Sequence, residues 1–121
     1  MAKLITLETF SSDSGNLTVF EKILPGTIKR AFYIYGAENA VRAGHRHRQA
    51  WNALICLNGQ CRVYVHDGEQ ETWHLLDDPE KCLILEPRDW HLMDNFSKET
   101  ILLVLSNEFY DKADYIYEKY A

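Results

Sequence analysis

Sequences that favour turns recur about every ten residues along this chain of 121 residues. They combine glycine, proline, asparagine and aspartate in pairs that are typical of tight turns. This spacing leaves room only for short strands and predicts an antiparallel, mostly β fold. The turn sequences are 12–16, 24–27, 58–59, 67–68, 76–80 and 85–89.

The segments between these turns are rich in β-branched and aromatic residues, as strands are. In 61–66, Cys61, Val63 and Val65 alternate with polar or larger residues, which predicts one buried face. The run 101–105 is apolar on both faces and predicts a central strand. Only the tail 110–121 suggests a helix, a short one packed outside the strands. We therefore expect an all-β sandwich or barrel, and favour a jelly-roll barrel whose mouth can gather polar side chains.

The composition fits one soluble domain over residues 1–121, with 46% hydrophobic residues and no repeat or linker. A net charge of -5 argues against a nucleic-acid partner. The sequence contains no signal peptide and no apolar run of membrane-spanning length, so we expect a cytoplasmic protein without a membrane partner. The three cysteines lie in apolar runs without metal-site spacing, and we expect them to be buried and reduced.

The stretch 42–48 carries two histidines one residue apart among arginines. On a strand, His45 and His47 point to one face, whereas Arg46 and Arg48 point to the other. The pair has three interpretations: accidental histidines at a solvated strand end, metal ligands, or proton carriers.

The metal interpretation needs further ligands. In barrel oxygenases this histidine spacing belongs to a site with a nearby carboxylate, but Trp51 and Asn52 stand where that carboxylate would be. His91 can supply a third nitrogen, so a site formed by His45, His47 and His91 stays an alternative.

The proton-carrier interpretation uses the ordinary pKa of histidine near 6.5, which suits proton transfer beside a ketone. It also gives the arginines a role, because guanidinium groups bind phosphate oxygens bidentately. Arg42, Arg46, Arg48 and Arg62 can hold an anionic substrate while the histidines act on its uncharged part.

Several segments together make almost the whole chain resemble the dTDP-4-keto-6-deoxyglucose 3,4-ketoisomerases of the cupin superfamily. The family's arginine, HxH and basic motif is matched by Arg42, His45, His47 and Arg48. The other matching segments are 28–35, the strand-turn-strand 54–68, 86–97 and the tail 102–116.

The resemblance implies a cupin-type jelly roll that forms a homodimer, often with exchanged N-terminal strands, without a metal or organic cofactor. The implied substrate is dTDP-4-keto-6-deoxyglucose, whose keto group moves from C4 to C3 through an enediol. The product leads to 3-amino-3,6-dideoxy sugars of surface glycans such as O-antigen lipopolysaccharide, or of secondary metabolites.

By this resemblance, His45 and His47 are the catalytic histidines, and Arg42 faces the substrate. We assign the C3 proton to His45, because related sugar 3,5-epimerases place their base there, and the shuttle to His47. His91 matches a position beside the sugar that helps to set the C4 configuration. Ser14 matches a second such position, normally occupied by a larger residue.

Tyr33, Tyr35, Arg30 and Arg62 are also expected near the substrate, on strands that line the barrel. The chain departs from the family motif at Ala43, where glycine is usual, and at Arg46, where a small residue is usual. The alternatives are a metal-dependent cupin enzyme and a non-catalytic cupin that binds a sugar nucleotide.

Overall fold

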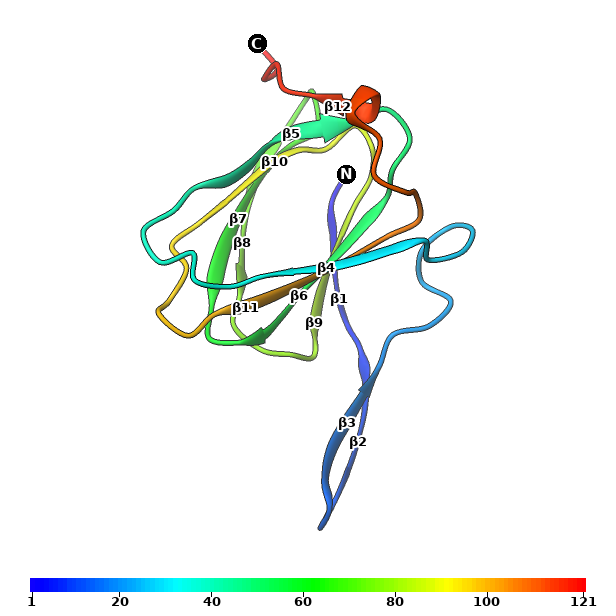
Figure 1. Cartoon of the computed structure of the whole chain (residues 1–121), viewed down its shortest axis with the longest axis vertical. Helices are drawn as coiled ribbons and strands as arrows, with labels where there is room; N and C mark the ends of the chain where they lie inside the picture. The colour runs from blue at the N-terminus through cyan, green and yellow to red at the C-terminus, as the bar shows by residue number, and fades with distance from the viewer.

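The computed structural model describes all residues 1–121, and its strands form two five-stranded sheets and a separate hairpin (Figure 1). All strand pairs are antiparallel. The first sheet consists, in spatial order, of β1 (Lys3–Thr6), β9 (Lys81–Leu85), β6 (Asn52–Asn58), β11 (Ile101–Ser106) and β4 (Arg30–Ile34). The second consists of β12 (Tyr115–Ile116), β5 (Arg42–His47), β10 (Trp90–Asp94), β7 (Cys61–His66) and β8 (Glu71–Leu76). The predicted all-β jelly-roll class is confirmed, although no strand pair joins the two sheets into a closed barrel.

The main hydrophobic core lies between the two sheets. Cys61, Val63 and Val65 of β7 are buried there, as their alternation predicted. Leu102 and Val104 of β11 face them from the first sheet. Because both inner faces are apolar, burial of this layer supplies the main driving force for packing the sheets.

A second hydrophobic cluster covers the outer face of the first sheet. There Leu7 and Leu24 pack on Ala53, Ile55 and other side chains of β6 and β9. This layer explains why 101–105 is apolar on both faces, and β11 does lie centrally, between β6 and β4. All three cysteines are free and buried, as expected.

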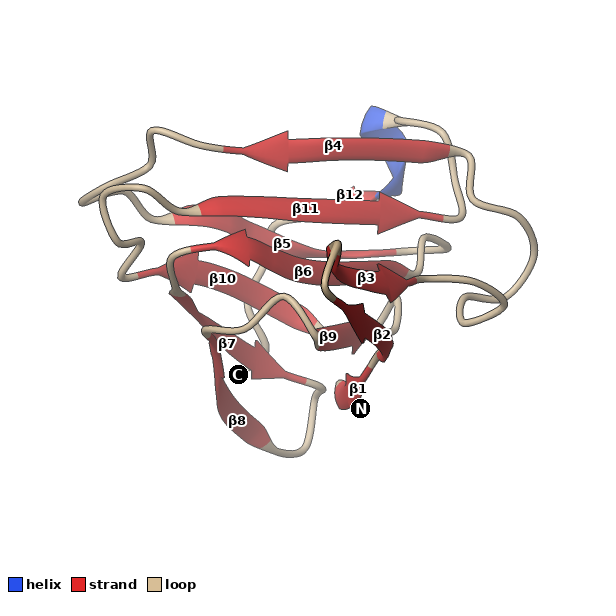
Figure 2. Cartoon of the chain, turned by 90° about the horizontal axis from the view of Figure 1, so that it is seen from below, coloured by secondary structure: helices blue, strands red, loops and turns tan.

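The expected short C-terminal helix is only a minor feature, a 3-10 turn of three residues. Figure 2 shows a single short helical turn, the 3-10 turn η1 (Lys112–Asp114), beside β12. The Asp111 side chain caps it by accepting a hydrogen bond from the backbone of Ala113. Tyr115 and Ile116 then leave helical geometry to pair with β5, because edge-strand hydrogen bonds replace those that a further helical turn would make.

The hairpin of β2 (Glu8–Ser12) and β3 (Gly15–Val19) projects away from the two sheets (Figure 1). Phe10 and Leu17 are directly paired across it and are 56% and 60% exposed. The chain contains no helix with the length and hydropathy needed to span a bilayer.

Candidate active site

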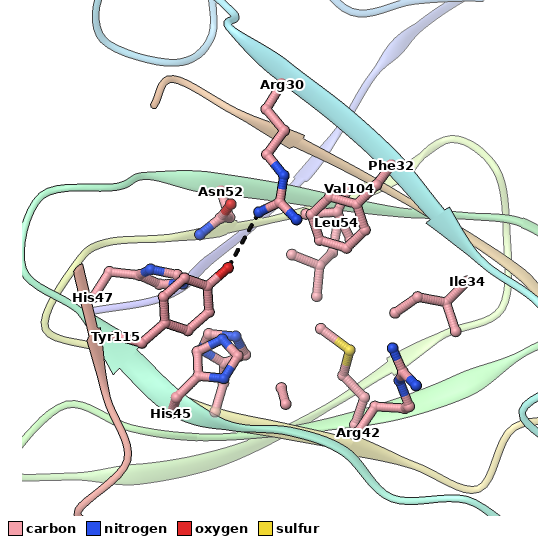
Figure 3. Close-up of a pocket in the computed structure, with 13 residues that line it drawn as sticks. Arg30, Phe32, Ile34, Arg42, His45, His47, Asn52, Leu54, Val104 and Tyr115 are labelled. Atoms are coloured by element: carbon pink, nitrogen blue, oxygen red, sulfur yellow. Dashed lines mark hydrogen bonds between the residues drawn. The ribbon is translucent and has the colours of Figure 1, made fainter. Parts of the chain in front are cut away.

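A cavity of about 220 Å³ opens between the sheets, near β4 of the first sheet and β5 of the second (Figure 3). Strands of both sheets contribute side chains to its wall, so the wall combines apolar residues from the core with polar ones. Those with polar groups are Arg30, Arg42, His45, His47, Asn52, His91 and Tyr115.

Three histidines meet in this cavity. His45 and His47 point inward from β5 because they are two residues apart, and His91 lies opposite His45 on the neighbouring strand β10. The ring centroid of His45 is 5.0 Å from those of both His47 and His91. The predicted clustering of the HxH pair with His91 is thus present in the fold.

A β-bulge in β5 brings Arg42 into the same cavity. The pairing of β5 with β10 shifts register between His91 and Leu92, opposite residues 43–45. Ala43 and Gly44 take positive φ values of 67° and 80° to accommodate the extra residue. Regular alternation would place Arg42 on the face opposite to His45, so the bulge is what directs this guanidinium into the cavity.

Asp114 fixes the orientation of His47. Nδ1 of His47 lies 2.8 Å from Oδ2 of Asp114, and Oδ1 of the same carboxylate accepts hydrogen bonds from the backbones of Arg48 and Gln49. Because the carboxylate accepts, Nδ1 carries the proton, and Nε2 of a neutral His47 has a free lone pair. This arrangement makes His47 a proton acceptor whose protonated form is stabilised by the adjacent negative charge.

Burial keeps the histidines neutral at physiological pH. Burial, together with the neighbouring His47, lowers the pKa of His45 to about 4. Burial and the nearby His45 lower the pKa of His91 to about 3. Burial also lowers the pKa of His47, but Asp114 opposes this by hydrogen bonding and charge. His47 is therefore the histidine with a built-in partner for an added proton.

Sequence reasoning missed Asp114 and Tyr115. Tyr115 lines the cavity with its ring centroid 4.6 Å from that of His45 and 4.7 Å from that of His47. Both residues lie in the tail that was expected to form an outer helix, and only its pairing with β5 brings them to the site. The resemblance of this tail to the family was the one signal that could have identified them.

Four of the residues expected near the substrate do not line this cavity. Tyr33 on β4 and Tyr35 just after this strand are exposed, and they line an adjacent groove together with Arg42. Ser14 lies at the tip of the projecting hairpin. Arg62 does not reach the cavity either.

Arg62 is held on the outside of the second sheet. It forms a bidentate ion pair with Asp94, with both distances 2.9 Å, and its guanidinium lies 4.1 Å from the ring centroid of Trp73. These contacts engage the charge that the sequence analysis assigned to a substrate phosphate. Arg30, in contrast, does line the cavity as expected.

The three histidines also have a geometry that is compatible with a metal ion. One ligand atom from each lies within 4.8 Å of the others. No carboxylate is available as a fourth protein ligand. Asn52 offers only an amide, and the Asp114 carboxylate is hydrogen-bonded to Nδ1 of His47. The donor set fits an open three-histidine site and not the histidine and carboxylate set of barrel oxygenases.

Comparisons with known proteins identify the family of this chain. The family model FdtA, described as WxcM-like, C-terminal, matches residues 1–121. The TDP-4-oxo-6-deoxy-alpha-D-glucose-3,4-oxoisomerase of Aneurinibacillus thermoaerophilus is 36% identical over 117 residues, which cover 94% of this chain and 84% of the relative.

Solved structures give the same result. WlaRA, a TDP-fucose-3,4-ketoisomerase from Campylobacter jejuni, has a TM-score of 0.90 and 35% identity over 97% of this chain and 89% of its own. A second structure is that of a His-to-Asn mutant of the 3,4-ketoisomerase QdtA from Thermoanaerobacterium thermosaccharolyticum, in complex with TDP-4-keto-6-deoxyglucose. It has a TM-score of 0.90 and 34% identity, and the match covers 97% of this chain and 87% of the QdtA chain. The chain belongs to the FdtA family of sugar 3,4-ketoisomerases.

Proposed function

We propose that this chain is a dTDP-4-keto-6-deoxyglucose 3,4-ketoisomerase that moves the keto group of the hexose from C4 to C3. The observation that carries the proposal is His47, held by Asp114 beside His45 in a cavity that Arg42 also lines. Such a site can take a proton from carbon and return one without redox chemistry. The names of the related proteins support this reaction and this substrate class.

His47 is the better candidate for the base. It removes the C3 proton, and the released electron pair forms a C3–C4 double bond while the C4 oxygen becomes an enediolate. The adjacent Asp114 stabilises the resulting imidazolium. His45, whose pKa of about 4 leaves it a weaker base, relays the proton from the C3 hydroxyl to the C4 oxygen. This division reverses the one expected from the resemblance to epimerases.

Protonation at C4 completes the reaction. The electron pair of the C3 oxygen re-forms a carbonyl, and the double bond takes the proton carried by His47 at C4. One C–H bond is broken and one is made, so the reaction needs no oxidant and no cofactor. The ring centroid of His91 lies 5.0 Å from that of His45, on the cavity wall. There His91 contacts the sugar from one side and helps to set the C4 configuration.

The nucleotide lies outside the cavity in this proposal. A volume of about 220 Å³ is below the range of about 300–1,000 Å³ for sites that enclose drug-sized ligands, so only the sugar is enclosed. Arg42 lines both the cavity and the groove bearing Tyr33 and Tyr35. We place the diphosphate on Arg42 and the thymine in that groove, against two rings whose centroids are 5.9 Å apart.

We further propose that the chain works as a homodimer with exchanged N-terminal hairpins. An isolated two-stranded hairpin is marginally stable in water, and the exposed Phe10 and Leu17 give it an apolar face for a second copy to cover. Ser14 can reach a sugar only in the partner's cavity in this arrangement. The expected molar mass in solution is twice 14.1 kDa, and Phe10→Asp with Leu17→Asp should shift the protein towards a monomer.

A cytoplasmic location fits three free cysteines.

Incubation with dTDP-4-keto-6-deoxyglucose tests the function. NMR should show a 3-keto product, and a 3-aminotransferase should trap it for assignment at C4. His47→Asn should abolish turnover while dTDP still binds. Absence of any conversion by wild type would favour a binding protein, and stoichiometric zinc, iron or nickel with loss of activity in chelator would favour the metal-dependent alternative.

A further inference from the structure

The hydroxyl of Tyr115 is placed in the cavity by a strand pairing. Tyr115 is the partner of His47 where β12 joins β5, and its ring packs edge-on against both His45 and His47. Figure 3 shows the hydroxyl pointing away from these rings towards Arg30. The side chain is therefore fixed at its ring end, and its oxygen lies on the cavity wall.

Arg30 occupies one lone pair of this hydroxyl. Nη1 of Arg30 donates a hydrogen bond of 3.2 Å to the Tyr115 oxygen, and the guanidinium is itself held over the rings of Phe32 and Tyr110. A guanidinium has only donors, so the tyrosine oxygen must accept, and its own O–H proton is left without a partner. Hydrogen bonding from a cation also makes that O–H a stronger donor.

Two of the three imidazoles at the cavity, those of His47 and His91, have their Nδ1–H groups engaged elsewhere. Nδ1–H of His47 is directed to Asp114, and Nδ1–H of His91 is directed to the backbone carbonyl of Asp89, at 2.9 Å. The enediolate that forms during ketone migration needs a donor aimed at the oxygen where negative charge develops. Tyr115 is the side chain at the cavity with an uncommitted O–H.

We propose that Tyr115 is a catalytic residue whose hydroxyl donates a hydrogen bond to the C4 oxygen as the enediolate forms, with Arg30 as its positioning residue. This inference rests on the proposed function. When the C3–H bond breaks, the proton goes to His47 and its electron pair forms the C3–C4 double bond. The carbonyl electron pair then moves onto the C4 oxygen, and the Tyr115 hydroxyl stabilises this charge without transferring electrons.

Tyr115→Phe tests the proposal because it keeps the ring between the histidines and removes only the donor. We expect kcat to fall by about 10²–10³-fold, as for loss of one oxyanion donor, with KM and the Kd for dTDP within about threefold of wild type. The exchange of the C3 proton with D2O, followed by NMR, should fall by the same factor as isomerisation. The matched control is Tyr117→Phe, a neighbouring tyrosine that does not line the cavity, which should leave both rates unchanged.

Arg30→Met tests the positioning role. Its effect on kcat should be smaller than that of Tyr115→Phe and should largely disappear in the Tyr115→Phe background, because both changes remove one interaction. Arg30→Lys should recover part of the activity, since it keeps a cation beside the hydroxyl.

Three results would overturn the inference. The first is a wild-type kcat in Tyr115→Phe. The second is that exchange of the C3 proton stays fast in this variant while product formation falls. The third is that the affinity of the variant for dTDP falls by as large a factor as kcat. Each is read only after wild type has converted the substrate, so failure of the proposed function is recognised first and separately.

Discussion

Asp114 and His47 form a hydrogen bond of 2.8 Å between groups that are 67 positions apart in the chain. Both side chains are largely buried, with exposed fractions of 11% and 7%. The carboxylate is fixed by the backbones of Arg48 and Gln49, so its direction does not depend on the histidine alone. The pair therefore presents a pre-oriented base to the cavity, and its charge balance can be altered with little change of shape.

Asp114→Asn should lower kcat by about 10²-fold or more, within the range found for loss of acid-base catalysis, because the imidazolium of His47 loses its stabilising charge. Activity requires unprotonated His47, whose pKa lies below the ordinary value, so wild-type kcat/KM should be flat above pH 6.5 and fall below it. In Asp114→Asn the acidic limb should move to lower pH, because Asp114 raises the pKa of His47. A pH-rate profile measures both effects, and an unmoved limb would contradict the assignment of His47 as base.

Protein stability should also depend on the buried histidines. The folded-state pKa values of His45 and His91 are about 4 and about 3, below the unfolded value near 6.5. Below pH 6.5 the unfolded chain binds protons that the folded chain excludes, so this part of the stability is complete above pH 6.5 and declines towards pH 3–4. Tm measured from pH 7 to 4 should fall, and His91→Gln should reduce the decline. A decline that is unchanged in this variant would argue against His91 as a source.

Arg42 and Arg62 should behave differently when each is replaced by alanine. Arg42→Ala should weaken dTDP binding by about tenfold or more, because charge-assisted hydrogen bonds to phosphate are lost. Arg62→Ala should leave the Kd for dTDP and the KM within about twofold, and should lower stability only slightly, because its pair with Asp94 is partly exposed and screened by solvent. Calorimetric titration with dTDP and denaturant unfolding separate the two effects. Equal losses of affinity would restore the sequence-based role of Arg62.

Ala43→Gly should raise the free energy of unfolding. Ala43 has a φ of 67°, in the left-handed region where a Cβ costs about 1–2 kcal/mol and glycine does not. Part of this gain is offset because glycine makes the unfolded chain more flexible, so we expect a net gain below about 1 kcal/mol. Denaturant unfolding of the two proteins measures it. Since the bulge is retained, kcat should not change. A loss of stability in Ala43→Gly would contradict the prediction that the left-handed backbone at this position is strained by the Cβ of alanine.

Several features of the fold follow from local sequence. The turn spacing predicted short antiparallel strands, and the alternation at Cys61, Val63 and Val65 identified a core face because side chains on a strand alternate strictly. The HxH spacing placed His45 and His47 on one face for the same reason. Such alternation does not locate the end of a strand: Leu57 is apolar but 46% exposed near the end of β6, where the turn begins.

The tail was misjudged because its outcome depends on a distant partner. Residues 110–121 carry charges and aromatics that suit a short helix, but hydrogen bonds from β5 favour an extended edge strand there. That pairing carries Asp114 and Tyr115 into the site. The helix or strand propensity of these residues and their neighbours contains no information about the open edge of β5, which lies far earlier in the chain.

The sequence alone determined the fold class and the histidine pair, because both depend on periodicities of a few residues. The tertiary structure decided which arginines line the cavity. A β-bulge directs Arg42 into the cavity, whereas contacts with Asp94 and Trp73 hold Arg62 on the outside of the second sheet. It also decided which histidine has a carboxylate partner. Those choices depend on register and on contacts between strands far apart in the chain, and alternation along one strand cannot specify either.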